Sequence, residues 1–73
     1  AIWYDKIVDD IKHINAKVIR VEIEANSKDL NNIIGHKKEN IIKLKDTYAV
    51  ITTVKCNNKI KPGKFKINVL ETA

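Results

Sequence analysis

The chain has 73 residues, enough for one compact domain with a single small core and too few for two independently folding domains. Hydrophobic residues make up 44% of it and charged residues 32%, a balance that excludes a disordered tail and a membrane-spanning chain. The net charge of +5 favours a polyanionic partner.

The first periodic segment is residues 3–14. Its apolar side chains recur at helical spacing, at Trp3, Ile7, Ile11 and Ile14. The pattern predicts an amphipathic helix. Because buried apolar area is scarce in so short a chain, we expect its apolar stripe to cover the domain's own core, with a partner's surface as the alternative.

A strand buried on one face is predicted for residues 17–25, where apolar and charged side chains alternate. The side chains expected to face the core are Ile19, Val21, Ile23 and Ala25.

Two short helices joined at a glycine are predicted next. Asn26 and Ser27 supply helix-capping chemistry, and Asp29 suits the positive end of the helix dipole. The first helix ends at Gly35, since glycine readily adopts the conformation that terminates helices. The second helix is predicted for residues 38–48.

Two strands complete the chain. Residues 49–56 are rich in β-branched side chains, and residues 65–69 alternate between apolar and polar ones. The order helix, strand, helix, helix, strand, strand predicts a single α+β domain, with an N-terminal helix within residues 1–16 and a core of residues 17–73. Because the chain begins with alanine rather than methionine, we expect it to be a piece of a longer protein.

The segment around the glycine resembles a known family. From Ile33 to Leu44 the chain reads Ile-Ile-Gly-His-Lys-Lys-Glu-Asn-Ile-Ile-Lys-Leu, which is similar to the core of a KH domain, where one helix ends in a glycine loop and a second begins at once. The strands predicted before and after this segment fall where that family places its first two. The resemblance implies the type I arrangement, a three-stranded antiparallel sheet with helices packed on one face.

The resemblance also implies a function. In KH domains a GXXG loop clamps the backbone of single-stranded nucleic acid while the bases lie against an apolar groove. Here the loop would be Gly35-His36-Lys37-Lys38, with a lysine in place of the second glycine. The groove would involve Ile34, Ile41 and the strand around Ile51. We therefore expect weak, salt-sensitive binding of single-stranded nucleic acid, with RNA as the first expectation and DNA as the alternative.

A cluster of lysines follows the second predicted strand. Residues 55–66 contain five lysines and no acid. Lys55, Lys59, Lys61 and Lys64 are expected to steer a polyanion toward the site, with the loop as the other wall of the groove. The alternative is a solvated loop that only aids solubility.

Other chemistry is not indicated. His13, His36 and the single cysteine, Cys56, have no zinc-ligand spacing, and no nucleotide-binding motif is present. We expect no catalysis, no metal, no cofactor and no membrane contact, and a cytoplasmic setting because no internal disulfide can form. The expected partners are single-stranded RNA or DNA and other domains of the parent protein. The alternative function is a KH-like docking or oligomerisation module that does not bind nucleic acid.

Overall fold

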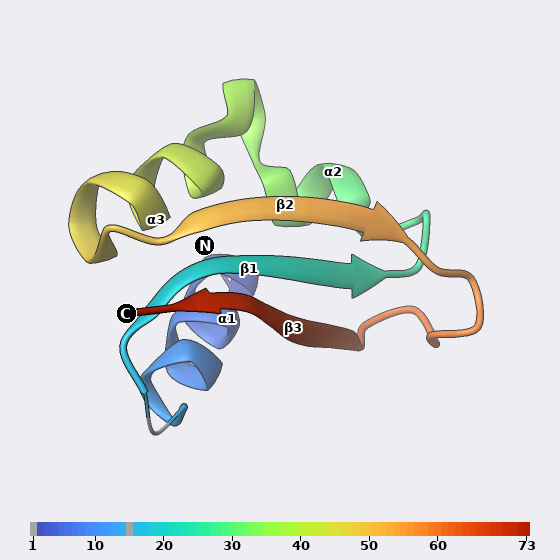
Figure 1. Ribbon diagram of the computed structural model, residues 1–73. Coiled ribbons are helices and arrows are strands. Elements are labelled where there is room, and N and C mark those ends of the chain that lie inside the picture. Colours follow the sequence, from blue (N-terminus) through green and yellow to red (C-terminus); the bar gives the residue numbers. More distant parts are fainter. Residues whose placement is uncertain (1, 15) are drawn as a thin grey trace.

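The computed structural model describes residues 2–14 and 16–73, and it contains the elements in the predicted order. Figure 1 shows their arrangement. The elements are α1 (Ile2–Lys12), β1 (Val18–Ala25), α2 (Leu30–Ile34), the 3-10 turn η1 (His36–Lys38), α3 (Glu39–Tyr48), β2 (Ile51–Cys56) and β3 (Phe65–Thr72). The N-terminal helix is shorter than predicted, because α1 ends at Lys12, while β3 continues three residues beyond the predicted strand.

The three strands form one mixed sheet with the order β2-β1-β3. β1 runs parallel to β2 and antiparallel to β3, so the predicted all-antiparallel sheet is wrong. The reason lies in the connections. The segment between β1 and β2 contains α2 and α3, which carry the chain back to the end of the sheet where β1 began, as parallel pairing requires. The short β2–β3 loop then crosses the end of β1, and β3 pairs antiparallel with the free edge of β1 (Figure 1).

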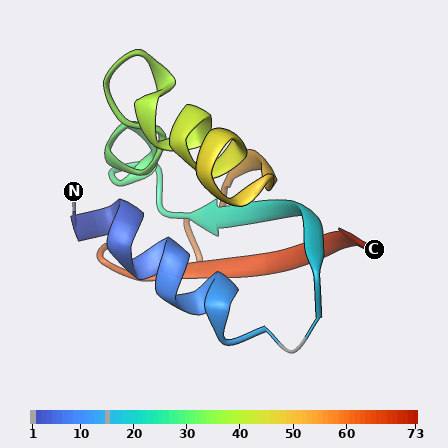
Figure 2. The ribbon, with the colours of Figure 1, turned by 90° about the vertical axis from the view of Figure 1, so that its left-hand side faces the viewer.

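The helices cover one face of this sheet, as predicted. Figure 2 shows α1 and the α2–α3 pair on the same side of the strands, with the opposite side uncovered. Strand alternation explains the asymmetry. Val21 and Ile23 of β1 are completely buried beneath the helices, whereas Glu22 and Glu24 face the uncovered side. The chain therefore forms an α+β domain with one packed face and one polar face.

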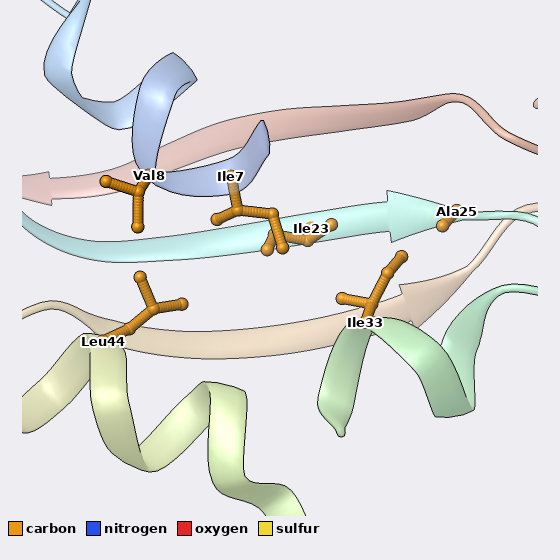
Figure 3. Close-up of a cluster of buried hydrophobic side chains, with 6 residues drawn as sticks. All are labelled: Ile7, Val8, Ile23, Ala25, Ile33 and Leu44. Carbon is orange, nitrogen blue, oxygen red and sulfur yellow. The ribbon is translucent and has the colours of Figure 1, made fainter. Parts of the chain in front are cut away.

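The main core lies where the helices meet the central strand, and Figure 3 shows its six buried side chains. They are Ile7 and Val8 of α1, Ile23 and Ala25 of β1, Ile33 of α2 and Leu44 of α3. The prediction that the N-terminal helix covers the domain's own core is confirmed, since Ile7 is 1% exposed. Burying an isoleucine or leucine side chain contributes about 1.5–3 kcal/mol. Each helix thus supplies at least one side chain that holds it to the sheet.

A smaller core lies at the other end of β1, where Val18 and Val21 pack against Val50. The sequence predicted Ile19 rather than Val18 on this face. The difference arises from a break in the regular pairing of β1 and β3 on either side of Arg20. Such an irregularity changes which side chains face the core. Arg20, now opposite Glu71, points its Nε at that carboxylate from 3.5 Å.

Candidate nucleic-acid interface

The turn between α2 and α3 has an unusual backbone. Gly35 has φ 83° and ψ 168°, a region essentially restricted to glycine. Lys37 and Lys38 follow with φ of 53° and 62°, both in the left-handed region. The N–H of Lys38 closes the turn by donating to the carbonyl of Gly35 at 3.1 Å. Lys38 therefore holds a backbone conformation that glycine adopts readily.

A buried asparagine supports this turn from below. The Nδ2 of Asn40 donates to the carbonyls of Ile33 at 3.0 Å and Asn32 at 3.2 Å, and the residue is 1% exposed. These carbonyls belong to the last turn of α2, where no helical partner remains for them. Sequence reasoning missed Asn40. It lies four residues before Leu44, on the core-facing side of the helix, where a polar residue indicates a specific hydrogen bond.

An apolar groove adjoins the turn, between the helices α2 and α3 and the edge strand β2. It has a volume of about 190 Å³ and is lined by Ile34, Lys38, Ile41, Thr52 and Val54. Three of these five residues were predicted site residues. The turn and the groove are continuous, because Lys38 belongs to both.

One predicted groove residue lies elsewhere. Ile51 is 38% exposed, and alternation along β2 turns it to the face opposite Thr52, so its predicted place in the groove is wrong. Thr52 and Val54 take that place. Thr52 pairs with Val21, and Val54 pairs with Ile23. The sequence predicted that Val21 and Ile23 face the core, but the parallel register that aligns β2 with them could not be predicted from the residues of β2 alone.

Thr52, which lines the groove, has an unpaired polar atom beneath the surface. The residue is 7% exposed, and its Oγ1 is buried with no hydrogen-bond partner among residues 2–14 and 16–73. Its neighbour Thr53, on the opposite face, donates from Oγ1 to the carbonyl of Val21 at 3.4 Å.

The surface of the turn is open and positively charged. His36, Lys37 and Lys38 are all exposed, and α3 begins directly after them at Glu39. The start of a helix carries a partial positive charge, so the dipole of α3 and the lysines act in the same direction. Together they favour an anion at the turn.

The loop between β2 and β3 is fixed against the segment that follows β1. The N–H of Gly63 donates to Oδ2 of Asp29 at 2.8 Å, and Nδ2 of Asn26 donates to the carbonyl of Ile60 at 3.1 Å. Asp29 lies at the start of α2, near the positive end of its dipole as predicted, but the expected side-chain cap from Asn26 or Ser27 is wrong, since Asp29 is the capping residue and makes no side-chain capping bond. Asn26 and Asp29 hold the lysine-rich loop instead.

The predicted lysines do not gather at the groove. Lys55 lies opposite Glu24 on the uncovered face of the sheet, and Lys64 lines a separate hollow of about 250 Å³ that includes Asp9 and Asp10 of α1. Lys59 and Lys61 are exposed on the loop. None of the four is among the residues that line the groove, so the loop is not its second wall within the described part of the chain.

A carboxylate network occupies the uncovered face of the sheet. Glu24 accepts from Nδ2 of Asn68 at 2.6 Å and from Nδ2 of Asn57 at 3.1 Å. These two bonds, the bond from Asn68 first, hold the pKa of Glu24 below its usual range, and the charges of Lys66 and Lys55 act in the same direction. The charge of Lys55 is thus directed toward Glu24 rather than toward the groove.

Comparisons with models of protein families, with curated proteins and with solved structures find no match for this chain. Within residues 2–14 and 16–73, no cluster of three or more His, Cys, Asp or Glu side chains is arranged to hold a metal ion. In the same part of the chain, no helix has the length and apolar character needed to cross a membrane.

Proposed function

We propose that this domain is a KH-like module that binds single-stranded nucleic acid. The turn formed by Gly35, His36, Lys37 and Lys38 holds the phosphate backbone, and the adjoining groove receives a base. The fold departs from the type I arrangement in its mixed sheet, so the proposal depends on the turn and groove rather than on strand pairing.

The observation that carries the proposal is the continuity of the turn with the groove. Lys38 has the left-handed backbone of a glycine position, and it also lines the groove beside Ile34 and Ile41. A phosphate held at the turn would therefore place the attached nucleotide at the mouth of an apolar hollow. Phosphate attraction and base burial are the two contributions that such binding needs.

Titration with short single-stranded RNA and DNA at low salt tests this function. We expect the amide resonances of residues 34–41 and 52–54 to shift together. The double variant K37D/K38D should bind at least about tenfold more weakly. The slope of its log affinity against log salt should fall by about 1.4, since each lost phosphate contact lowers that slope by about 0.7. Aspartate tolerates left-handed backbone better than most residues, so the turn should persist in this variant.

The matched control is K17D/K28D, which makes the same charge change at two exposed lysines outside the turn. It should weaken binding much less, because it lowers only the long-range attraction. Equal losses of affinity in the two double variants would contradict the proposed function. So would the absence of a resonance shift at the groove residues with either nucleic acid.

The alternative, a docking or oligomerisation module, is supported by a different observation. Ile42, Val69 and Leu70 are each 40% or more exposed, and Val69 and Leu70 lie on the edge strand β3. Exposed apolar side chains on an unpaired edge favour association with another chain. Light scattering across a concentration series tests this alternative, which predicts a rise in mass that L70K would abolish.

A further inference from the structure

One of the residues that line the groove has a buried polar atom that is left unpaired within the described part of the chain. Around Thr52 the lining side chains Ile34, Ile41 and Val54 are aliphatic, and the hydroxyl of Thr52 has no partner among the described residues. Most buried polar atoms in proteins are paired, and an unpaired one is destabilising. Valine has nearly the same shape and would fill this position without that penalty. An unpaired hydroxyl on a residue that lines a groove therefore points to a ligand that completes its hydrogen bonding.

We infer that Thr52 is the specificity-determining residue of the groove, where its hydroxyl hydrogen-bonds the polar edge of one unpaired nucleobase. This inference rests on the proposed function and adds the group that reads the base. The hydroxyl both donates and accepts, so it can pair with a ring nitrogen, an exocyclic oxygen or an amino group. The ligand is a flexible strand that inserts a single base between α3 and β2.

The size of the groove and its polarity both favour a base. Pockets for drug-sized molecules have volumes of about 300–1,000 Å³, and this groove, at about 190 Å³, suits a smaller group. An aliphatic side chain from a protein partner would fit, but it would leave the hydroxyl of Thr52 unpaired. A base combines apolar faces for Ile34 and Ile41 with a polar edge for Thr52.

The hydroxyl reaches the ligand by a change of rotamer. In the free protein Oγ1 is inaccessible to solvent although Thr52 lines the groove, so other atoms of Thr52 form the surface. Rotation about χ1 to another staggered position exchanges Oγ1 with the similarly sized methyl group. Binding is therefore expected to change the χ1 coupling constants and the methyl shift of Thr52. Neither change is expected with a strand that lacks bases.

The test compares T52V, which removes the hydroxyl and keeps the shape, with T52S, which keeps the hydroxyl. Each protein is titrated with homo-oligomers of each base and with an abasic strand of equal length. We expect the wild type to prefer one base by about three- to tenfold, the range of one net hydrogen bond. T52V should lose this preference but retain its affinity for the abasic strand, and T52S should keep the preference. Thermal unfolding should show that T52V is at least as stable as the wild type.

The possible failures are distinct. If T52V retains the base preference of the wild type, Thr52 does not read the base, and the inference is wrong while the proposed function stands. If the wild type binds the abasic strand as tightly as every homo-oligomer, no base enters the groove, and only phosphate binding remains. If the wild type binds none of these strands at low salt, the proposed function and the inference both fail.

Discussion

The side-chain amide of Asn40 donates a 3.0 Å hydrogen bond to the carbonyl of Ile33, which joins the first turn of α3 to the last turn of α2. The two helices are also joined by the exposed turn, and Ile33 and Leu44 bring them to the same core cluster. Asn40 also lies directly beneath Gly35, because a Cβ built on that glycine would approach the Asn40 amide to 3.1 Å. A buried polar side chain therefore helps to set the geometry of the proposed phosphate site.

Replacing Asn40 with alanine should destabilise the domain by about 1–3 kcal/mol, because the carbonyls of Asn32 and Ile33 lose their partner and a small cavity forms. Urea unfolding measures the change. The matched control is N31A, an exposed position on α2, for which we expect a change within about 0.5 kcal/mol. Similar stabilities for the two variants would show that the Asn40 bonds do not hold the turn.

Two residues with left-handed backbone provide a second comparison, at opposite ends of α3. Lys38 precedes the helix with φ 62°, and Ala49 ends it with φ 56°. Left-handed backbone costs a residue with a Cβ about 1–2 kcal/mol relative to the usual region. Substitution by glycine at either position should therefore stabilise the domain, by up to about 1 kcal/mol after the greater chain entropy of glycine is included. Thermal unfolding of K38G and A49G checks this.

Only one of these two variants should affect binding. K38G removes a lysine from the turn, so the slope of log affinity against log salt should fall by about 0.7. A49G is remote from the groove lining and should leave the slope unchanged. A fall in slope with both variants would mean that the change reflects altered folding rather than a lost phosphate contact.

The two glycines of the chain should respond differently to alanine. Gly35 and Gly63 both have positive φ, 83° and 85°, so both substitutions introduce backbone strain. At Gly35 the new Cβ would also lie 3.0 Å from Cγ of Glu39, whereas at Gly63 nothing lies within 4 Å. We expect G35A to lose about 1–3 kcal/mol, and G63A to lose less. Chemical unfolding of both variants is the measurement, and a larger loss for G63A would contradict the described packing.

The sequence predicted the elements well because their periodicity is a local property. The helical stripe of Ile7 and Ile11 and the alternation of Val21 and Ile23 each require only one face to be buried, whatever the partner. The predicted cover of the core by α1 followed from the scarcity of apolar area in so short a chain, and the burial of Ile7 confirms it. Gly35 likewise ends α2 as predicted.

The pairing of the elements was less predictable, because it depends on contacts between distant segments. The long helical connection before β2 is compatible with parallel pairing, but the type I resemblance led to an antiparallel sheet. In the parallel register, Thr52 rather than Ile51 faces the groove. The irregular pairing at Arg20 places Val18 rather than Ile19 in the core. The lysine-rich loop was also misplaced, because its course depends on Asp29 bonding to Gly63, a contact that charge and composition do not reveal.

Glu24 gives a prediction about pH. Its pKa is lowered in the folded protein, first by the bonds from Asn68 and Asn57 and then by the nearby lysines. Near its usual pKa the unfolded chain therefore binds more protons at this residue than the folded one. Its contribution to stability is complete above the usual carboxylate range and is lost as the pH falls through the lowered value. Lowering the pH should therefore reduce the free energy of unfolding through the lost contacts of Glu24 on the uncovered face of the sheet.

The variant N68A tests this linkage, because it removes the shorter of the two bonds to Glu24. The pKa of Glu24, followed by NMR of its carboxyl carbon, should rise toward the usual value, and the acid unfolding midpoint should move to higher pH. The control N31A lies on α2 and should change neither quantity. A Glu24 pKa that stays low in N68A would assign the shift to Asn57 and the lysines instead. Neither Asn68 nor Lys55 lines the groove, and the charge of Lys55 acts on Glu24 instead. Oligonucleotide binding at the groove should therefore be the same in N68A as in the wild type.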